Sequence, residues 1–532
     1  MPSCNGADTG CDITRPEREL TSNAGAPLRE RLENLLQGGK QMAAIKRLTG
    51  APSAGTDKGW QRIDWQTARR EVRRLQTRIA KAVSEGRHGK VKALQWLLTR
   101  SFAGKALAVK RVVSNRGRKT PGVDGSIWYT PRQRMRAVQA LRRRGYKAKP
   151  LRRVLIPKKN GKMRPLGIPT MHDRAMQALY ALALQPVAET TGDPNSYGFR
   201  LYRSCADAIH QCYIGLAKRY SARWILEGDI KACFDDISHQ WLLRHIPMDR
   251  LMLRQWLNAG YFEGGKLYPT KAGTPQGGII SPLLANMTLD GLEAAVKAVT
   301  PYRSKVNVIR YADDFVITGK TKGLLEEAIK PAVERFLTER GLTLSPEKTR
   351  ITRIEDGFDF LGQHPRKYSG KFLTKPARSN YRTILTRLRE TIRKFSAMKA
   401  GDMVRALNPI IRGWTNFHRN IAAKGTFAAL DSQIYRYLRD WAQRRHPHKG
   451  KRWLTKTYWH STPDGTYFSV IEKTPEGKRR ATLIKATSTK IERHIKIRGA
   501  ANPFDPKDVE YFRERKAEQQ RRRAGRAARK AA

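Results

Sequence analysis

The feature that most constrains the fold of this chain is a pair of adjacent acids between two β-rich runs. Asp313 and Asp314 follow the run Val306–Tyr311 and precede the run Phe315–Gly319. Two such runs that meet at a short turn predict a hairpin, with the acids at its tip. Neighbouring carboxylates repel each other, so they are usually solvated or bridged by a hard divalent cation. Taken alone, this pair is most simply interpreted as a solvated turn.

A second apolar run also ends in a carboxylate. The segment Trp224–Ile230 has the character of a strand, Asp229 lies at its end, and a predicted helix follows. Beside the hairpin-tip pair, this acid would complete a ligand set for two Mg²⁺ ions. Nucleotidyl transfer needs that arrangement, because one metal lowers the pKa of the primer 3′-hydroxyl and both stabilise charge on the phosphoryl group. We expect Asp235 and Asp236 to be helix-start or surface acids instead.

The charge balance points to a polyanionic partner. The 532 residues include 105 Lys and Arg against 46 Asp and Glu, which gives a formal net charge of +59. Such a chain repels itself unless a polyanion neutralises it, and nucleic acid is the obvious candidate. Charge alone does not separate a structural RNA binder from a polymerase, so both interpretations stay open here.

Neither a zinc knuckle nor a membrane protein is predicted. The five cysteines contain no C-x-x-C pair, so zinc binding and a disulfide framework both lack support. The segment Met1–Asn23 is polar, and no 18 apolar residues run together. We therefore expect a cytoplasmic, nucleoid-associated protein without membrane contact.

Periodicity divides the chain into five parts and predicts the α+β fold class. Residues 1–60 mix small polar and charged residues and are expected to form a loosely ordered arm. Residues 61–119 predict basic amphipathic helices, and residues 120–365 alternate short β-branched runs with helical stretches. The helical period returns in residues 375–450. Residues 451–532 contain a hairpin-like segment and a basic tail, which we expect to bind nucleic acid.

At the hairpin tip the sequence resembles the reverse transcriptases, whose hallmark motif is similar to Tyr311–Asp314. The resemblance implies that Asp229, Asp313 and Asp314 are catalytic and bind two Mg²⁺ ions. The predicted metal set also includes Ile230, which follows the strand-end acid.

The resemblance also outlines a nucleotide pocket. Phe234 stands where the family has an aromatic gate, and a ring there would clash with a ribose 2′-hydroxyl and favour deoxynucleotides. The string Lys271–Asn286 looks like the second palm motif, in which Gln276 would lie near the sugar or base. In a basic hairpin upstream, Lys158 and Arg164 are candidates for binding the triphosphate. A core ring, a plain loop and solvated bases remain the structural alternatives.

Further strings narrow the resemblance to the group II intron-encoded proteins. They occur in that family's order: Thr120–Gly125, Asn195–Arg200, Gly341–Thr349 and Phe360–Gly362. The segment Leu407–Asn420 resembles the family's maturase, or thumb, domain. The resemblance thus implies a right-hand polymerase fold with fingers and palm, followed by an α-helical thumb/maturase domain and a basic C-terminal extension.

The function implied by this resemblance is that of an RNA-directed DNA polymerase encoded by a group II intron. It implies a ribonucleoprotein in which the protein binds the intron RNA to assist splicing and copies it into DNA during retrohoming. Deoxynucleoside triphosphates and target DNA are the other implied partners, and a homodimer stays open. We expect RNA contacts from Arg412, Trp414, Asn416, His418 and Arg419.

One departure from the family pattern and two alternatives complete the interpretation. Many members continue into an H-N-H endonuclease, whereas a basic tail follows Ala501–Pro506 here, and His460 and His494 are interpreted as surface histidines. No second-strand cleavage is therefore expected, so a primer would come from elsewhere, such as a nascent strand at a replication fork. A retron or defence-type reverse transcriptase is disfavoured by the maturase-like helices. A catalytically silent splicing chaperone is disfavoured by the intact, mutually repelling acids.

Overall fold

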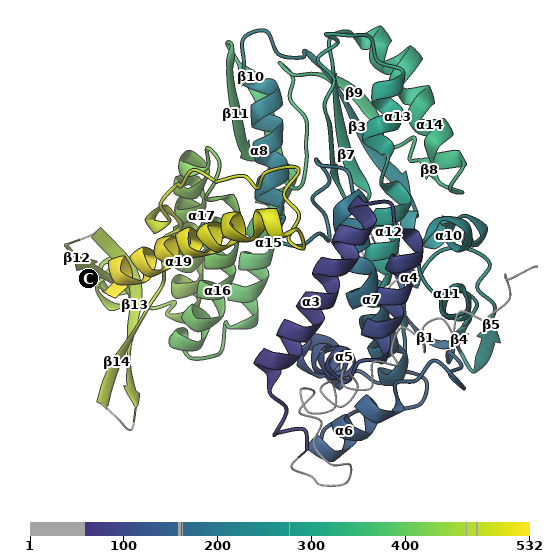
Figure 1. Cartoon of the computed structure of the whole chain (residues 1–532). Coiled ribbons are helices and arrows are strands. Elements are labelled where there is room, and N and C mark those ends of the chain that lie inside the picture. Colours follow the sequence, from purple (N-terminus) through teal and green to yellow (C-terminus); the bar gives the residue numbers. More distant parts are fainter. Residues whose placement is uncertain are drawn as a thin grey trace, which may run out of the picture.

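The computed structural model describes residues 59–157, 161, 163–275, 277–463, 465–474 and 477–531 (Figure 1). The arm predicted for residues 1–60 lies outside the described residues except at its end. In the described part of the chain, no helix has the length and apolar character needed to cross a membrane.

The N-terminal region packs several helices around one buried helix. Its elements are α3 (Trp65–Ser84), α4 (His88–Arg100), α5 (Phe102–Ser114), α6 (Pro131–Ala140) and α7 (Met171–Thr191). Helix α7 is buried on all sides, as expected where apolar residues are not confined to one stripe. Helices α3, α4 and α5 pack directly against it. The bases of residues 61–119 therefore belong to amphipathic helices whose apolar faces turn inward.

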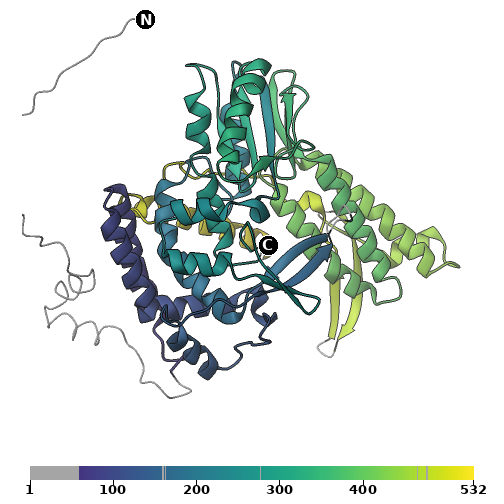
Figure 2. The same cartoon turned by 90° about the vertical axis from the view of Figure 1, so that its right-hand side faces the viewer.

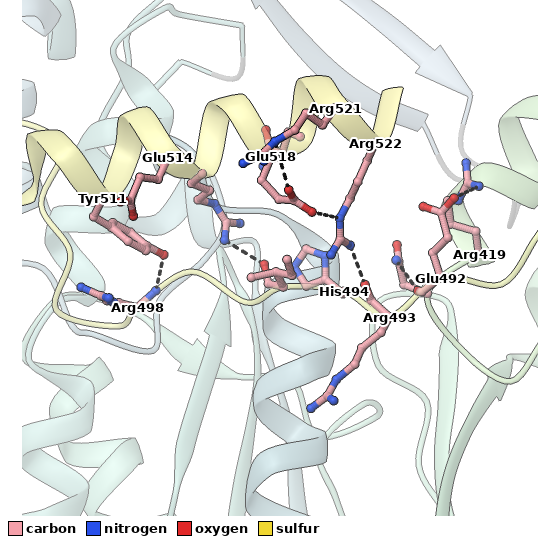
Figure 3. Close-up of a pocket in the computed structure, with 14 residues that line it drawn as sticks. Arg419, Glu492, Arg493, His494, Arg498, Tyr511, Glu514, Glu518, Arg521 and Arg522 are labelled. Atoms are coloured by element: carbon pink, nitrogen blue, oxygen red, sulfur yellow. Dashed lines mark hydrogen bonds and ion pairs between the residues drawn. The ribbon is translucent and has the colours of Figure 1, made fainter. Parts of the chain in front are cut away.

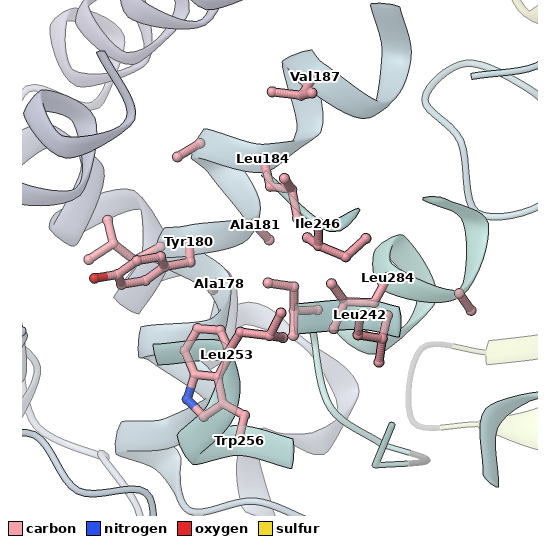
Figure 4. Packing of buried hydrophobic residues seen from close by; sticks show 14 of the residues in the cluster. Ala178, Tyr180, Ala181, Leu184, Val187, Leu242, Ile246, Leu253, Trp256 and Leu284 are labelled. Atoms are coloured by element: carbon pink, nitrogen blue, oxygen red, sulfur yellow. The ribbon is translucent and has the colours of Figure 1, made fainter. Parts of the chain in front are cut away.

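Three shorter helices contribute to the same core. They are α10 (His239–His245), α11 (Arg250–Leu257) and α12 (Ser281–Leu289). Figure 4 shows Leu184 of α7 among side chains from these helices, such as Leu242 and Leu284. The core thus links the N-terminal helices to the segments that flank the acids.

A small four-stranded sheet forms the fingers. Its strands are β1 (Leu151–Pro157), β2 (Met163–Ile168), β4 (Tyr261–Glu263) and β5 (Lys266–Tyr268), in the order β2-β1-β4-β5. Strands β1 and β2 are antiparallel, which confirms the predicted basic hairpin. Its connection includes residues 158–160 and 162, which lie outside the described residues.

The palm is an antiparallel sheet of five strands in which β3 is central. Its strands are β3 (Trp224–Lys231), β6 (Val308–Tyr311), β7 (Asp314–Gly319), β8 (Thr343–Leu344) and β9 (Arg350–Arg353). Strand β3 pairs with β7 on one side and with β8 and β9 on the other. Strand β6 pairs with the far side of β7. The helices that accompany the sheet are α8 (Cys205–Leu216), α13 (Leu292–Ala298) and α14 (Lys330–Thr338), the last preceded by a π-helical turn at Leu324–Ile329.

Helices dominate the region after the palm. Its elements are the hairpin β10 (Gln363–Tyr368) and β11 (Lys371–Pro376), and helices α15 (Arg378–Lys394), α16 (Ala400–His418), α17 (Lys424–Arg445) and α18 (Lys451–Tyr458). The predicted turn at Thr462–Gly465 joins β12 (Trp459–Thr462) to β13 (Gly465–Thr474), and β14 (Gly477–Thr482) extends this hairpin to three strands. The basic tail forms helix α19 (Val509–Ala531). Figure 2 shows the palm sheet at the top, the N-terminal helices at the lower left and this helical region on the right. The predicted domain boundaries stay predictions.

The glycine before the strand-end acid has a packing role. Gly228 on β3 is paired with Phe315 on β7, and a Cβ at this glycine would overlap the phenylalanine ring. The absence of a side chain therefore lets the buried ring pack against the β3 backbone next to Asp229.

Gly228→Ala should lower the free energy of unfolding by about 1–3 kcal/mol, because overpacking a filled core costs that much. Gly413→Ala is the matched control, since this exposed glycine in α16 has open space around it. The control should raise stability by about 1 kcal/mol through helix propensity. Denaturant unfolding followed by circular dichroism measures both, and equal midpoints would contradict the packing role.

Candidate active site

Pairing between β3 and β7 brings the predicted acids together. Asp229 is paired directly with Asp314, and Asp313 lies in the turn between β6 and β7. Directly opposed residues on antiparallel strands have Cβ atoms about 4.5–5.5 Å apart. The polymerase interpretation required Asp229 to lie beside the hairpin tip, and the register places it there.

The turn that carries the acids has a strained backbone and is in close contact with a neighbouring loop. Ala312 has a φ of +58°, a left-handed conformation that residues with a Cβ rarely adopt. The Tyr197 backbone N–H donates to the Arg310 carbonyl at 2.8 Å, just before the turn. A Cβ on Gly198 would overlap the backbone of Ala312. The loop from residue 195 to residue 198 therefore fixes the turn by close backbone contact.

A buried ion pair anchors the same strand. The Arg310 guanidinium donates to the Asp290 carboxylate at 2.6 Å and to the Asn286 side chain at 3.2 Å. Asn286 in turn donates to the Gly198 carbonyl at 2.6 Å. Because breaking a buried pair leaves an uncompensated charge, this network resists movement of β6.

The acids are crowded enough to disfavour full ionisation. Burial raises the pKa of Asp314 to about 7, and the charges of Asp313 and Asp229 and a hydrogen bond with Asp229 act in the same direction. Burial also raises the pKa of Asp313. Lys348, in the loop between β8 and β9, donates to both carboxylate oxygens of Asp229 at 2.9 Å. A proton and an ammonium group therefore supply the positive charge that this cluster needs.

The donors around this cluster suit a hard cation. Asp229, Asp313 and Asp314 offer carboxylate oxygens, the ligands that Mg²⁺ prefers. Among the described residues, no three Asp, Glu, His or Cys side chains are arranged as a ready cage for one ion. Mg²⁺ commonly binds through one or two carboxylates and substrate phosphates rather than in an all-protein cage. The residues present therefore fit a magnesium site that the substrate completes.

An aromatic pair lies next to the acids. Phe234 is half-buried in the short helix α9 (Cys233–Asp236), which follows β3. Its carbonyl accepts a hydrogen bond from the Thr274 backbone at 2.6 Å, so the loop from residue 271 to residue 275 is tied to α9. Its ring meets Phe199 edge to face at 6.2 Å between centroids, and Phe199 is 55% exposed. An accessible aromatic surface thus adjoins the carboxylates.

Of the remaining predicted site residues, two are described by the structure and two are not. Arg164 is exposed on β2, and its positive charge opposes the rise in the pKa of Asp313, which puts it within electrostatic range of the acids. Ile230 is buried and paired with Leu344 of β8. Lys158 and Gln276 lie outside the described residues.

Three family models match the chain in succession. The N-terminal domain of reverse transcriptase matches residues 60–141, and reverse transcriptase (RNA-dependent DNA polymerase) matches residues 156–364. The maturase-specific domain of group II introns matches residues 381–459. A curated relative, protein YkfC of Escherichia coli, is 33% identical over 55% of this chain and 86% of its own length.

The chain belongs to the group II intron reverse transcriptase/maturase family. The group II intron-encoded protein LtrA of Lactococcus lactis subsp. cremoris is 30% identical over 60% of this chain, and the match spans 65% of LtrA. Telomerase from Candida albicans shows only a weak structural likeness, with a TM-score of 0.34 and 11% identity over 58% of this chain and 64% of that chain. The family places reverse transcription and assistance of splicing in one polypeptide, and the predicted α+β polymerase class is confirmed.

The residues predicted to contact RNA divide into two groups on α16. Arg412 and Asn416 are exposed, whereas His418 is fully buried. Trp414 donates to the Asn380 side-chain oxygen of α15 at 2.6 Å, and its ring lies 4.6 Å from that of His418. Both side chains thus pack between helices, and His418, which is fully buried, offers RNA no surface, whereas Trp414 is only partly buried.

Arg419 also makes hydrogen bonds and an ion pair with other residues of the protein. Its guanidinium donates to the Glu492 carboxylate at 2.8 Å and to the Asn416 side chain at 2.9 Å, and its side chain is only 14% exposed. It joins the end of α16 to the C-terminal segment. An RNA contact by Arg419 would require this ion pair to be shared or exchanged.

Sequence reasoning missed two functional neighbours of the acids and the contact of one histidine. Lys348 stood inside a quoted motif, but nothing in its pattern indicated contact with Asp229, 119 residues away. Arg310 was part of a predicted strand, although a buried arginine needs a partner such as Asp290. His494, interpreted as a surface histidine, is partly exposed, but its ring bonds to the fully buried Asp207 at 2.9 Å, a contact that the sequence did not indicate.

Acid should destabilise the helical domain through His418. Burial lowers the pKa of this histidine to about 4; its Nε2–H donates to Asn380 at 3.2 Å, and its Nδ1 has no hydrogen-bond partner among the described residues. The neutral ring stabilises the fold fully above its unfolded pKa, near 6.5, and less as the pH falls toward 4. Between about pH 6.5 and pH 5 the loss should reach about 2 kcal/mol.

His418→Gln removes this titration, so it should lose correspondingly less stability than the wild type over that interval. His448→Gln, which replaces an exposed histidine, should behave like the wild type. Urea unfolding at the two pH values measures the difference. An identical pH response in His418→Gln and wild type would show that the buried ring does not titrate in this way.

Proposed function

We propose that this reverse transcriptase/maturase joins deoxynucleotides to a primer at Asp229, Asp313 and Asp314. The observation that carries the proposal is the direct pairing of Asp229 with Asp314 beside the tip residue Asp313. Burial and the nearby charges of Asp313 and Asp229 raise the pKa of Asp314, so the cluster favours a bound cation over separate charges. The family match independently supports RNA-dependent DNA synthesis.

The proposed site would hold two Mg²⁺ ions between the carboxylates and the substrate phosphates. When bound, the metal supplies Lewis acidity that activates the primer 3′-hydroxyl and stabilises charge on the transferring phosphoryl group. The chain's part is to fix the acids on the strained β6–β7 turn and on β3. Lys348 neutralises Asp229 in this structure and would yield that carboxylate to the metal.

The nucleotide would lie between the fingers and the acids. Arg164 would bind triphosphate oxygens, a role supported by the effect of its charge on Asp313. The Phe234 ring would pack under the sugar and exclude a ribose 2′-hydroxyl, and Phe199 supports that ring from the side. Lys158 and Gln276 keep their predicted roles at the triphosphate and at the sugar or base.

The same chain is proposed to bind its parent intron RNA, assist splicing and copy the intron into a DNA target. The maturase-specific match over residues 381–459 supports the RNA-binding part of this proposal. The net charge of +59 supplies phosphate contacts that do not depend on sequence. Specificity would then come from RNA shape and exposed bases near residues such as Arg412 and Asn416.

Two alternatives account for fewer observations. A retron or defence-type enzyme does not explain the maturase-specific match. A silent splicing chaperone does not explain why three acids, of which Asp313 and Asp314 have raised pKa values, converge beside an exposed aromatic ring. The polymerase accounts for both features.

Asp229→Asn should abolish nearly all primer extension on an RNA template with Mg²⁺. Removing one metal-binding carboxylate forfeits several kcal/mol of transition-state stabilisation, so the rate should fall roughly 1000-fold. Asp236→Asn is the matched control, because it neutralises an exposed acid seven residues further along. Its rate should stay within about twofold of the wild type, since surface substitutions usually change little.

The cDNA made by each protein, measured as primer extended per minute, distinguishes the outcomes. Equal rates for Asp229→Asn and wild type would overturn the site assignment. A wild type that binds intron RNA but extends no primer would instead support the silent chaperone.

A further inference from the structure

A segment beyond the maturase domain runs back from the helical domain onto the palm. We call the residues from Glu492 to Arg515 the strap. At its start, the Glu492 carboxylate accepts from Arg419 at 2.8 Å, and the Glu492 carbonyl accepts from the Asn420 side chain at 2.8 Å. Three strap residues, Ile497, Ala501 and Phe504, are almost completely buried. The strap is therefore a packed part of the fold that joins the end of α16 to the polymerase core.

The strap is held on the palm by a buried carboxylate. Asp207, in the first turn of α8, is fully buried and accepts hydrogen bonds from His494 at 2.9 Å, the Ile497 backbone at 2.8 Å and Arg515 at 3.3 Å. Burial alone would raise the pKa of Asp207, but the bonds from His494, Ser204 and the strap backbone outweigh it and lower the pKa to about 2. The carboxylate thus stays charged and binds donors from two strap regions that are far apart along the chain.

Helix α19 closes over this anchor. Figure 3 shows His494 and Arg493 beneath α19, on the wall of a cavity of about 630 Å³. The Arg515 guanidinium reaches down from the helix and also donates to the Ile495 carbonyl at 2.8 Å. Its side chain is only 9% exposed, so the guanidinium binds protein groups and has little contact with solvent.

The strap also contacts the loop that supports the catalytic turn. Arg203 donates to the Gly499 carbonyl of the strap at 2.7 Å and to the Pro194 carbonyl at 2.6 Å. Lys496 lies 3.5 Å from the hydroxyl of the fully buried Tyr197. The strap therefore contacts the loop from residue 194 to residue 203 at Arg203 and at Tyr197.

That loop is in direct contact with the turn that carries the acids. The Tyr197 backbone bonds to Arg310, and Gly198 abuts Ala312, next to Asp313. We propose that the strap, anchored by Arg515 and His494 on Asp207, positions the Asp313–Asp314 turn and is required for full polymerase activity. This inference rests on the proposed polymerase function and assigns positioning residues to it, none of which touches substrate.

Arg515→Gln tests the proposal, with Arg513→Gln as its control. Both changes remove one positive charge from the same helix, but Arg513 is 71% exposed and pairs only with Glu510 of α19 among the described residues. Pre-steady-state primer extension with the RNA template–primer in excess separates the burst amplitude, which counts active molecules, from the burst rate of those molecules. We expect the burst rate of Arg515→Gln to fall about tenfold, which corresponds to about 1.4 kcal/mol in the barrier.

The KM for deoxynucleotides should not change in Arg515→Gln, because the strap does not reach the nucleotide. Arg515→Lys should recover part of the rate, since a lysine retains the charge facing Asp207. Arg513→Gln should match the wild type in rate and amplitude. Binding of the intron RNA should be equal in the two glutamine variants, because they lose the same charge.

Three results would overturn the proposal. A normal burst rate in Arg515→Gln, even with reduced amplitude, would mean that the strap only stabilises the fold. An equal loss of rate in Arg513→Gln would assign the effect to charge instead of position. A wild type that extends no primer at all would overturn the proposed polymerase itself, and the strap inference with it.

Discussion

The pairing of Asp229 with Asp314 is the constraint on which the rest of the structure depends. Two strands place these carboxylates opposite each other, and the turn adds Asp313 beside them. Burial and mutual repulsion disfavour three separate negative charges, so the cluster needs a proton, an ammonium group or a metal ion. The rest of the palm can be understood as a frame that holds the acids together despite this cost.

The frame extends well beyond the two strands. Gly228 gives space to the Phe315 ring beneath the acids, and Asp290 holds Arg310 at the base of the hairpin. The loop that includes Gly198 presses against the turn, and the strap lies behind that loop. Because the strap also bonds to Arg419 at the end of α16, the domain that matches the maturase model is joined to the catalytic turn by continuous packing.

Local patterns in the sequence were sufficient to predict the hairpin, the acid at the end of β3 and the basic fingers hairpin, because each depends on neighbouring residues. They were insufficient for contacts set by the tertiary fold. Nothing local indicated that Lys348 lies against Asp229, or that His494 bonds to a carboxylate 287 residues away. His418 and Trp414 were predicted to bind RNA from their motif, but helical periodicity alone did not reveal that both pack against α15.

The central claim is that the acids of β3 and of the β6–β7 hairpin bind one shared set of divalent ions. Its most direct test is the electron paramagnetic resonance of Mn²⁺ titrated into the protein with an RNA template, a dideoxy-terminated DNA primer and the matching deoxynucleotide. Tight Mn²⁺ binding should be lost in Asp229→Asn and in Asp314→Asn alike. Tight binding that persists in Asp229→Asn while it disappears in Asp314→Asn would show that β3 does not share the metal, and would contradict the account.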